Sequence, residues 1–206
     1  MGYSLPEVLI ASVVLAIVLL AICIVYDTGL QDYARGTARA DIQQNVRVAL
    51  ESMARELRTA GYAVSNIPNA DCAAPPCAVT ALTSSSVTFQ AGVDGDTQTD
   101  NVIYAFVAPS DPTKPCDSSN PATVGRITRS VQAWNGTAWT PATPTPDDLA
   151  QCVTAVTMTY YDSSGATTAT PADVRRINIS ITGTENTRGW GARTYSLTSD
   201  VRLRNL

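Results

Sequence analysis

The chain has 206 residues, of which 45% are hydrophobic and only 6% aromatic, and its formal net charge at pH 7 is -4. It contains no histidine, which excludes Ser-His and Cys-His nucleophile systems and histidine-ligated metal sites. The acidic balance offers no overall positive field that would hold nucleic acid, so we expect no nucleic-acid partner.

Residues 8–26 are an uncharged apolar run, VLIASVVLAIVLLAICIVY. As a helix, this run would extend about 28 Å at about 1.5 Å per residue, close to the thickness of the hydrocarbon layer of a membrane. Pro6 and Glu7 precede it, and both suit a first helical turn. A carboxylate beside a membrane span is costly and usually has a partner or a function. We therefore expect a membrane-spanning helix with a functional carboxylate at its start.

Residues 28–60 contain no proline and predict that the same helix continues. Arg58 followed by Gly61 is typical of a helix C-terminus. Apolar residues recur at steps of three and four, with charged and amide side chains between them. These apolar positions are Ile42, Val46, Ala49, Leu50, Met53, Leu57 and Ala60. The second half of the helix is therefore predicted to be amphipathic and to lie on a folded domain.

The rest of the chain, residues 62–206, has the size of one domain. Alternating or β-branched segments predict strands at residues 78–83, 86–91, 101–107, 125–130, 153–161, 174–182 and 194–204. Asn135-Gly136, between Trp134 and Trp139, predicts a hairpin whose two tryptophans either cover the sheet or form an exposed tip. The expected fold class is α+β, with the long helix packed on an antiparallel β-sheet head.

Four of the five cysteines follow the apolar run, and the fifth, Cys23, lies inside it. An even number beyond a membrane span suits disulfides in an oxidising compartment. Cys72, Cys77, Cys116 and Cys152 allow three pairings, which the sequence alone does not distinguish. The short ring between Cys72 and Cys77 favours that pair together with Cys116–Cys152. The paired CxxC motifs of a tetrathiolate zinc site are missing.

One loop offers oxygen ligands that calcium could use: Asp94, Asp96 and Asp100, with Gln98 between them. The loop lacks the glutamate of an EF-hand, and a bare polar loop between two strands is the alternative interpretation. No other cofactor is expected. We interpret the carboxylate pairs Asp147/Asp148 and Asp162/Asp173 as solvated turn residues. With no glycine-rich phosphate loop either, the sequence predicts a protein that is not an enzyme.

The N-terminal residues resemble the type IV pilins and the pseudopilins of type II secretion. The signature of that family is a glycine at a cleavage point, an aromatic residue next, and a glutamate five residues into the mature chain, followed by an apolar run. Gly2, Tyr3 and Glu7 match it, with Tyr3 in place of the usual Phe. The resemblance implies that a prepilin peptidase cuts between Gly2 and Tyr3 and methylates the new amine. It also implies that Glu7 guides assembly by meeting the Tyr3 amine of a neighbouring chain.

Two other interpretations of this N-terminus fit the residues less well. A secretory signal peptide needs a basic n-region and a small-x-small cleavage site, and Tyr26-Asp27-Thr28 offers neither. Lipidation at Cys23 is disfavoured by the bulky Ile22 before it. A cysteine that acts as a small hydrophobic residue is the better interpretation of Cys23.

Four later segments are similar to the minor pilin W and pseudopilin J branch of the family: residues 57–62 (LRTAGY), 100–104 (DNVIY), 126–129 (RITR) and 201–206 (VRLRNL). The resemblance implies a residual leader at residues 1–2, a transmembrane or filament-core half-helix at 3–27, an amphipathic half-helix at 28–61 and a disulfide-tied pilin-like head at 62–206. It implies a non-enzymatic minor pilin that acts in pilus initiation or in a tip complex. The alternatives are a minor pseudopilin and a membrane-anchored binding module that uses the Trp134–Trp139 hairpin.

The partners implied by this resemblance are other pilin or pseudopilin subunits, a prepilin peptidase and the inner-membrane assembly platform. The implied location is the bacterial inner membrane, with a single span and the head outside the cytoplasm, followed by the pilus or pseudopilus.

Overall fold

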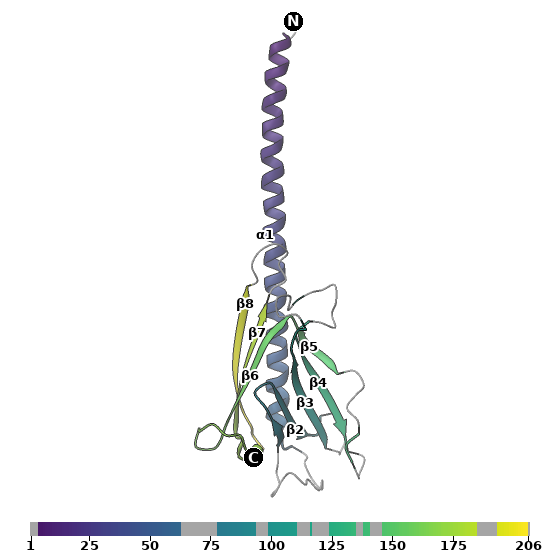
Figure 1. Cartoon of the computed structure of the whole chain (residues 1–206), viewed down its shortest axis with the longest axis vertical. Coiled ribbons are helices and arrows are strands. Elements are labelled where there is room, and N and C mark those ends of the chain that lie inside the picture. Colours follow the sequence, from purple (N-terminus) through teal and green to yellow (C-terminus); the bar gives the residue numbers. More distant parts are fainter. Residues whose placement is uncertain are drawn as a thin grey trace. The chain divides into compact units, whose positions relative to one another are not determined.

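The computed structural model describes residues 4–62, 78–93, 99–110, 116, 124–134, 138–140, 146–184 and 193–205. The chain divides into two compact units, Met1–Ala40 and Asp41–Leu206. We call the second unit the head. Helix α1, Leu5–Thr59, is continuous through both units (Figure 1), and all of the strands belong to the head.

Helix α1 begins and ends where local signals predict. Its first turn follows Ser4, whose carbonyl accepts the N–H of Glu7 at 3.0 Å and of Val8 at 3.3 Å. After the last helical residue, Gly61 has φ +81°, a conformation that glycine adopts at helix ends without a Cβ penalty. The side-chain amide of Asn205 donates to the carbonyl of Ala60 at 3.2 Å. The C-terminal segment of the chain therefore satisfies an orphan carbonyl at the end of the helix.

The described residues of the head form two antiparallel sheets (Figure 1). The first has the order β1-β2-β3-β4-β5, with bounds Val79–Leu82, Ser86–Ala91, Asp100–Val107, Arg126–Ala133 and Asp147–Gln151. The second has the order β6-β7-β8, with bounds Val153–Tyr161, Arg176–Thr184 and Thr194–Arg202. The short 3-10 helix η2, Pro171–Asp173, precedes β7. The expected α+β class is confirmed, each predicted strand is present, and the strands are divided between two sheets.

Strand β5 is the element that the sequence patterns missed. Asp147 and Asp148, interpreted above as turn residues, open this strand and pair with Arg129 and Thr128 of β4. Aspartate has a low strand propensity, so neither residue signals a strand by itself. The edge position tolerates the exposed carboxylates, and Asp148 forms an ion pair with Arg126 at 3.3 Å.

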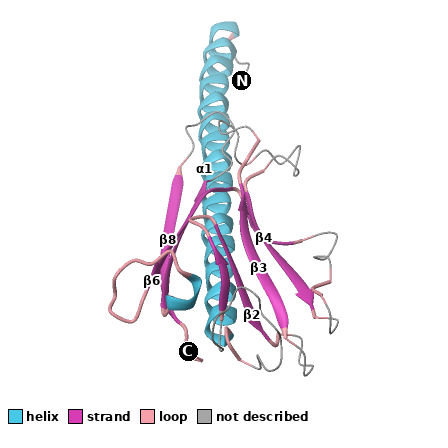
Figure 2. Ribbon diagram, turned by 60° about the horizontal axis from the view of Figure 1, so that its bottom comes forward, coloured by secondary structure: helices cyan, strands magenta, loops and turns pink. Residues whose placement is uncertain are grey.

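The core of the head lies between α1 and the two sheets. Figure 2 shows strands of both sheets flanking the helix, β2, β3 and β4 on one side and β6 and β8 on the other. The buried helix residues are Ile42, Val46, Ala49, Leu50, Met53, Ala54 and Leu57. All but Ala54 belong to the predicted apolar stripe. A Cβ added to Gly183 would lie 2.9 Å from Cγ2 of Val46 and 3.1 Å from Cγ2 of Ile42, so this glycine lets β7 approach the helix closely.

Strand β6 joins the second sheet to the first. The N–H of Met158 donates to the carbonyl of Ser84 at 2.8 Å, and the N–H of Val153 donates to that of Gly125 at 2.9 Å. The buried hydroxyl of Tyr160 lies 2.8 Å from the carbonyl of Thr83. With β6 joined in this way, β8 is the outer edge of the second sheet.

Candidate functional site

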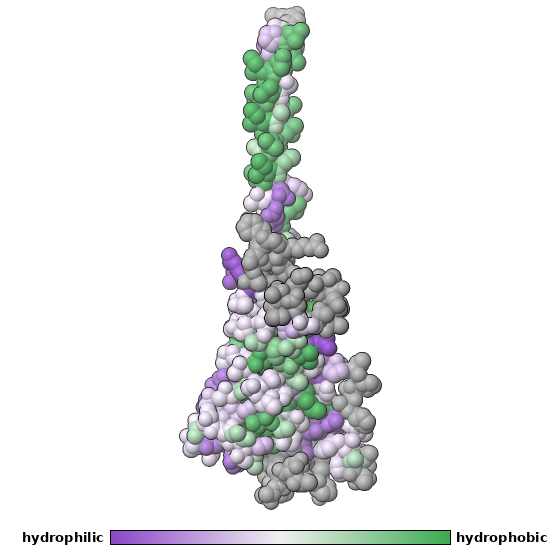
Figure 3. All heavy atoms as spheres, in the orientation of Figure 1, coloured by the Kyte–Doolittle hydropathy of each residue, from purple (hydrophilic) through white to green (hydrophobic). Residues whose placement is uncertain are grey.

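The first part of α1 carries large apolar side chains around its whole circumference. Their exposed fractions range from 48% at Val18 to 80% at Leu5. The face drawn in Figure 3 is coloured as hydrophobic along nearly this entire segment. A helix that is apolar on all sides needs an apolar surrounding on all sides, which a membrane or a bundle of similar helices provides.

Two hydroxyl groups in this segment are satisfied within the helix. The hydroxyl of Ser12 donates to the carbonyl of Leu9 at 2.8 Å, and that of Thr28 donates to the carbonyl of Ile24 at 2.8 Å. Such internal pairing is what a hydrocarbon surrounding requires, because no water is present there to accept a bond. The helix is long and apolar enough to cross a membrane once, which is consistent with single-pass anchoring.

Glu7 lies in the first turn of α1, and its side chain is exposed. Pro6 stands beside it, where its missing N–H does not interrupt the helical hydrogen bonds. The predicted processing residues, Gly2 and Tyr3, lie outside the described residues. The role of Glu7 in assembly therefore stays a prediction about contacts between chains.

One of the favoured disulfides is present: Cys116 is bonded to Cys152, the residue between β5 and β6. Cys152 has φ +61°, a left-handed conformation that is uncommon for a residue with a side chain. The other favoured pair, Cys72 and Cys77, lies outside the described residues. Cys23 is a free cysteine on the exposed surface of the apolar helix segment.

The calcium candidate is only partly described. Asp94, Asp96 and Gln98 lie outside the described residues, whereas Asp100 is the first residue of β3 and is 1% exposed. Its carboxylate accepts the N–H of Val93 at 3.2 Å, which links the residues after β2 to the start of β3. Within the described ranges, no group of three His, Cys, Asp or Glu side chains could hold a metal ion.

A charged cluster that the sequence analysis missed connects α1 to the first sheet. Both carboxylate oxygens of Glu56 accept the Nε–H of Arg129 on β4, at 3.0 and 3.1 Å. The hydroxyl of Tyr104 on β3 donates to Glu56 at 2.7 Å. Burial, reinforced by this hydrogen bond and the Glu56 charge, raises the pKa of Tyr104 well above its usual value. The sequence contains a signal for this cluster. Glu56 lies three residues after Met53, so a charged side chain falls on the apolar stripe of the helix and needs a partner there.

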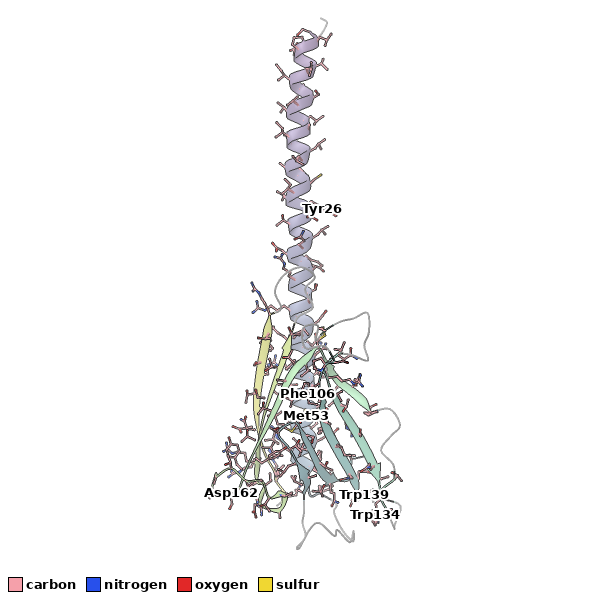
Figure 4. All side chains as sticks on the ribbon, viewed as in Figure 1. Tyr26, Met53, Phe106, Trp134, Trp139 and Asp162 are labelled. Atoms are coloured by element: carbon pink, nitrogen blue, oxygen red, sulfur yellow. A yellow bond between two sulfur atoms is a disulfide. The ribbon has the colours of Figure 1, made fainter. Side chains whose placement is uncertain are left out.

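The predicted tryptophan hairpin closes with an antiparallel bridge between Trp134 and Trp139. The two rings meet edge to face with centroids 5.1 Å apart, and both are half-buried (Figure 4). The residues at the tip of this hairpin, 135–137, lie outside the described residues.

The turn interpretation of Asp162 is confirmed. Its exposed carboxylate accepts the hydroxyl of Ser164 at 2.7 Å and the N–H of Ala166 at 3.0 Å. The bond from the Ser164 hydroxyl, helped by the backbone N–H groups of the turn, lowers the pKa of Asp162. The Asp162 carboxylate therefore closes its own turn, whereas Asp173 is the last residue of η2.

The head also has a groove between α1 and β8, with a volume of about 370 Å³. The groove is lined by Arg47, Leu50, Glu51, Ala54, Arg55, Arg58, Leu197, Thr198 and Ser199. Three arginines against one glutamate give this lining a net charge of +2. The sequence pattern predicts only that charged side chains lie between the apolar positions of the helix, and it does not show that β8 lies beside these arginines.

No model of a known protein family matches the chain, and no curated protein shows significant similarity to it.

Proposed function

We propose that this protein is a minor pilin of a type IV pilus, a non-enzymatic filament subunit that acts in pilus initiation or in a tip complex. The observation that carries the proposal is the first part of α1, which is exposed and apolar on every side and has Glu7 in its first turn. The same helix continues into an amphipathic part that carries an α+β head. A subunit that is held in a membrane before assembly needs both parts, an apolar helix that is stable in lipid and a head that folds in water.

The proposed sequence of events starts with the chain as a single-pass protein of the inner membrane. A prepilin peptidase removes the leader before Tyr3, and the assembly platform moves the subunit into the filament. The apolar helix segment then leaves lipid and enters a bundle of similar segments. Because it contacts apolar groups in both places, burial of apolar area contributes little net free energy to this transfer.

Glu7 is proposed to set the register of the subunits. An ionised carboxylate in an apolar bundle is costly unless a cation pairs with it. The new α-amino group of Tyr3 on a neighbouring chain would supply that cation. A pair of this kind contributes specificity of alignment, since its attraction largely offsets the cost of removing both charges from water.

The test is Glu7→Ala in the full chain, followed by recovery of filaments sheared from cells. We expect incorporation into filaments to be lost while the head retains its near-ultraviolet circular dichroism. Asp32→Asn is the matched control, because Asp32 lies on the same helix with a 65% exposed side chain, and it should assemble normally. Normal incorporation of the Glu7→Ala chain would disprove the proposed role of Glu7.

A minor pseudopilin of a type II secretion system would use the same N-terminal residues. Deletion of the gene separates the two functions: loss of protein export with filaments intact indicates a pseudopilin, and loss of filaments indicates a pilin.

A further inference from the structure

The groove between α1 and β8 combines an apolar floor with a cationic rim. Leu50 and Ala54 are 6% and 5% exposed and form the floor together with the half-buried Leu197. Glu51 pairs with Arg47 at 3.3 Å, which leaves Arg55 and Arg58 as the uncompensated charges of the rim. Among the described residues, no carboxylate forms an ion pair with either of them. The groove is therefore suited to an anionic occupant.

Strand β8 adds a second property to this groove, because it is an edge strand. Residues 194–199 of this strand, TYSLTS, carry no charge. Edge strands usually bear charges or prolines that prevent another strand from pairing with them. An uncharged edge beside a cationic groove favours an extended, acidic segment that adds to the sheet.

The chain itself carries a segment of that kind at the other edge of the head. Strand β5 is the last strand of the first sheet and begins with the exposed residues Asp147 and Asp148. Arg126 pairs with Asp148, whereas among the described residues no cation forms an ion pair with Asp147. Figure 1 shows β5 and β8 at opposite sides of the head.

We propose that the groove between α1 and β8 receives the β5 edge of a second copy of this chain, which brings the acidic end of β5, Asp147 and Asp148, beside Arg55 and Arg58. The two surfaces differ, so the contact is head to tail, and each added copy brings a further groove and a further β5 edge. Contacts of this type generate open helical assemblies when the rotation does not close a ring. The inference rests on the proposed filament function and names the neighbour that the head would contact.

The test uses two differently tagged full-length chains in membranes of one cell, both with Cys23→Ala to remove the free thiol. One carries Ser199→Cys in the groove and the other carries Gln151→Cys on β5, so all four proposed charges are retained. Mild oxidation should join the two tags in one disulfide-linked species. Asp173→Cys replaces Gln151→Cys in the control pair, because Asp173 is an exposed acidic position on η2, outside β5, and should give no such species.

Charge reversal then tests the electrostatic part. Arg55→Glu with Arg58→Glu in the groove chain should lower the cross-linked yield about tenfold, a change in free energy of about 1.4 kcal/mol. Asp147→Lys with Asp148→Lys in the other chain should restore the yield. An unchanged yield after reversal would overturn the inference.

Two further measurements on the same cells distinguish failure of the inference from failure of the proposed function. They are the N-terminal residue of the chain and its presence in filaments. Chains that begin at Tyr3 and enter filaments but give no cross-link overturn the inference alone. A cross-link from Ser199→Cys only to a different host pilin overturns it as well. A cross-link between chains that keep Met1 and enter no filament supports the contact and overturns the pilin function.

Discussion

Glu56 is a charged residue on the buried face of an otherwise apolar helical stripe, and the structure shows why it is tolerated there. Its side chain is 24% exposed, and that of its partner Arg129 is 20% exposed. Arg129 donates to both of its oxygens, and Tyr104 donates to one of them. A pair of charges removed from water in this way is stable only while each partner satisfies the other.

Glu56→Gln should therefore destabilise the head by about 2–4 kcal/mol, because Arg129 would remain half-buried without a counter-charge. The free energy of unfolding can be measured with urea on the full chain in detergent, by tryptophan fluorescence, since Trp134, Trp139 and Trp190 all belong to the head. Glu51→Gln is the control, because an exposed ion pair contributes less than about 1 kcal/mol. Equal losses in the two variants would contradict the buried role of Glu56.

Tyr104 and Tyr160 predict how stability changes in alkaline solution. Burial, with Glu56 adding to the effect at Tyr104, raises the pKa of both phenols above the ordinary value of about 10. Above that pH the unfolded chain loses phenolic protons that the folded head keeps, so the free energy of unfolding falls as pH rises. The loss should reach about 1.4 kcal/mol per pH unit for each tyrosine.

The measurement is a series of urea titrations from pH 8 to pH 11. Tyr160→Phe should reduce the alkaline slope, whereas Tyr62→Phe, at a 63% exposed side chain, serves as the matched control. A Tyr160→Phe chain with the slope of the original protein would contradict this account.

At the scale of the elements, the disulfide joins Cys116 to the junction between β5 and β6. The two cysteines are separated by 36 residues in the sequence. A disulfide that closes a loop of this length lowers the conformational entropy of the unfolded chain. This effect stabilises the head by at most about 4 kcal/mol. Cys152 also has a left-handed φ of 61° between two strands.

Two substitutions at Cys152 separate these contributions. Both Cys152→Ala and Cys152→Gly remove the disulfide and should lower the free energy of unfolding by about 3 kcal/mol. Cys152→Gly should be the more stable of the two by about 1 kcal/mol, because glycine adopts positive φ without a Cβ penalty. Urea titration measures both, and a glycine variant less stable than the alanine variant would contradict the explanation.

At the scale of the whole molecule, the chain must satisfy two surroundings at once. Its first helical residues expose apolar side chains on every side, whereas the head buries its apolar residues between α1 and the sheets. A protein with this composition needs a membrane or similar helices for its first part and water for its second. The proposed filament function accounts for both requirements.

The N-terminal peptide of the protein from host membranes provides the direct test at this scale. We expect its mass to correspond to a chain that begins at methylated Tyr3, since Gly2, Tyr3 and Glu7 match the pilin signature. Retention of Met1, or a start at lipidated Cys23, would mean that the helix is only an anchor. The membrane-anchored binding module, with Trp134 and Trp139 near its contact surface, would then be the better interpretation.

Most of the fold follows from local patterns in the sequence. The apolar run, the stripe from Ile42 to Leu57 and the helix end at Gly61 depend on neighbours within a turn or two, so periodicity and composition predict them. The same holds for the alternating strands and for the bridge at Trp134 and Trp139. The prediction that Gly2 and Tyr3 are processing residues also comes from the sequence alone.

Tertiary structure decided the features that depend on contacts between distant residues. It divided the strands into two sheets, placed Asp147 and Asp148 in an edge strand, paired Glu56 with Arg129, and set β8 beside the arginines of α1. No local propensity encodes these features, because each depends on which partner the folded chain brings near. The sequence determined where the chain is apolar and where it turns, and the packing of α1 against both sheets determined which charges meet.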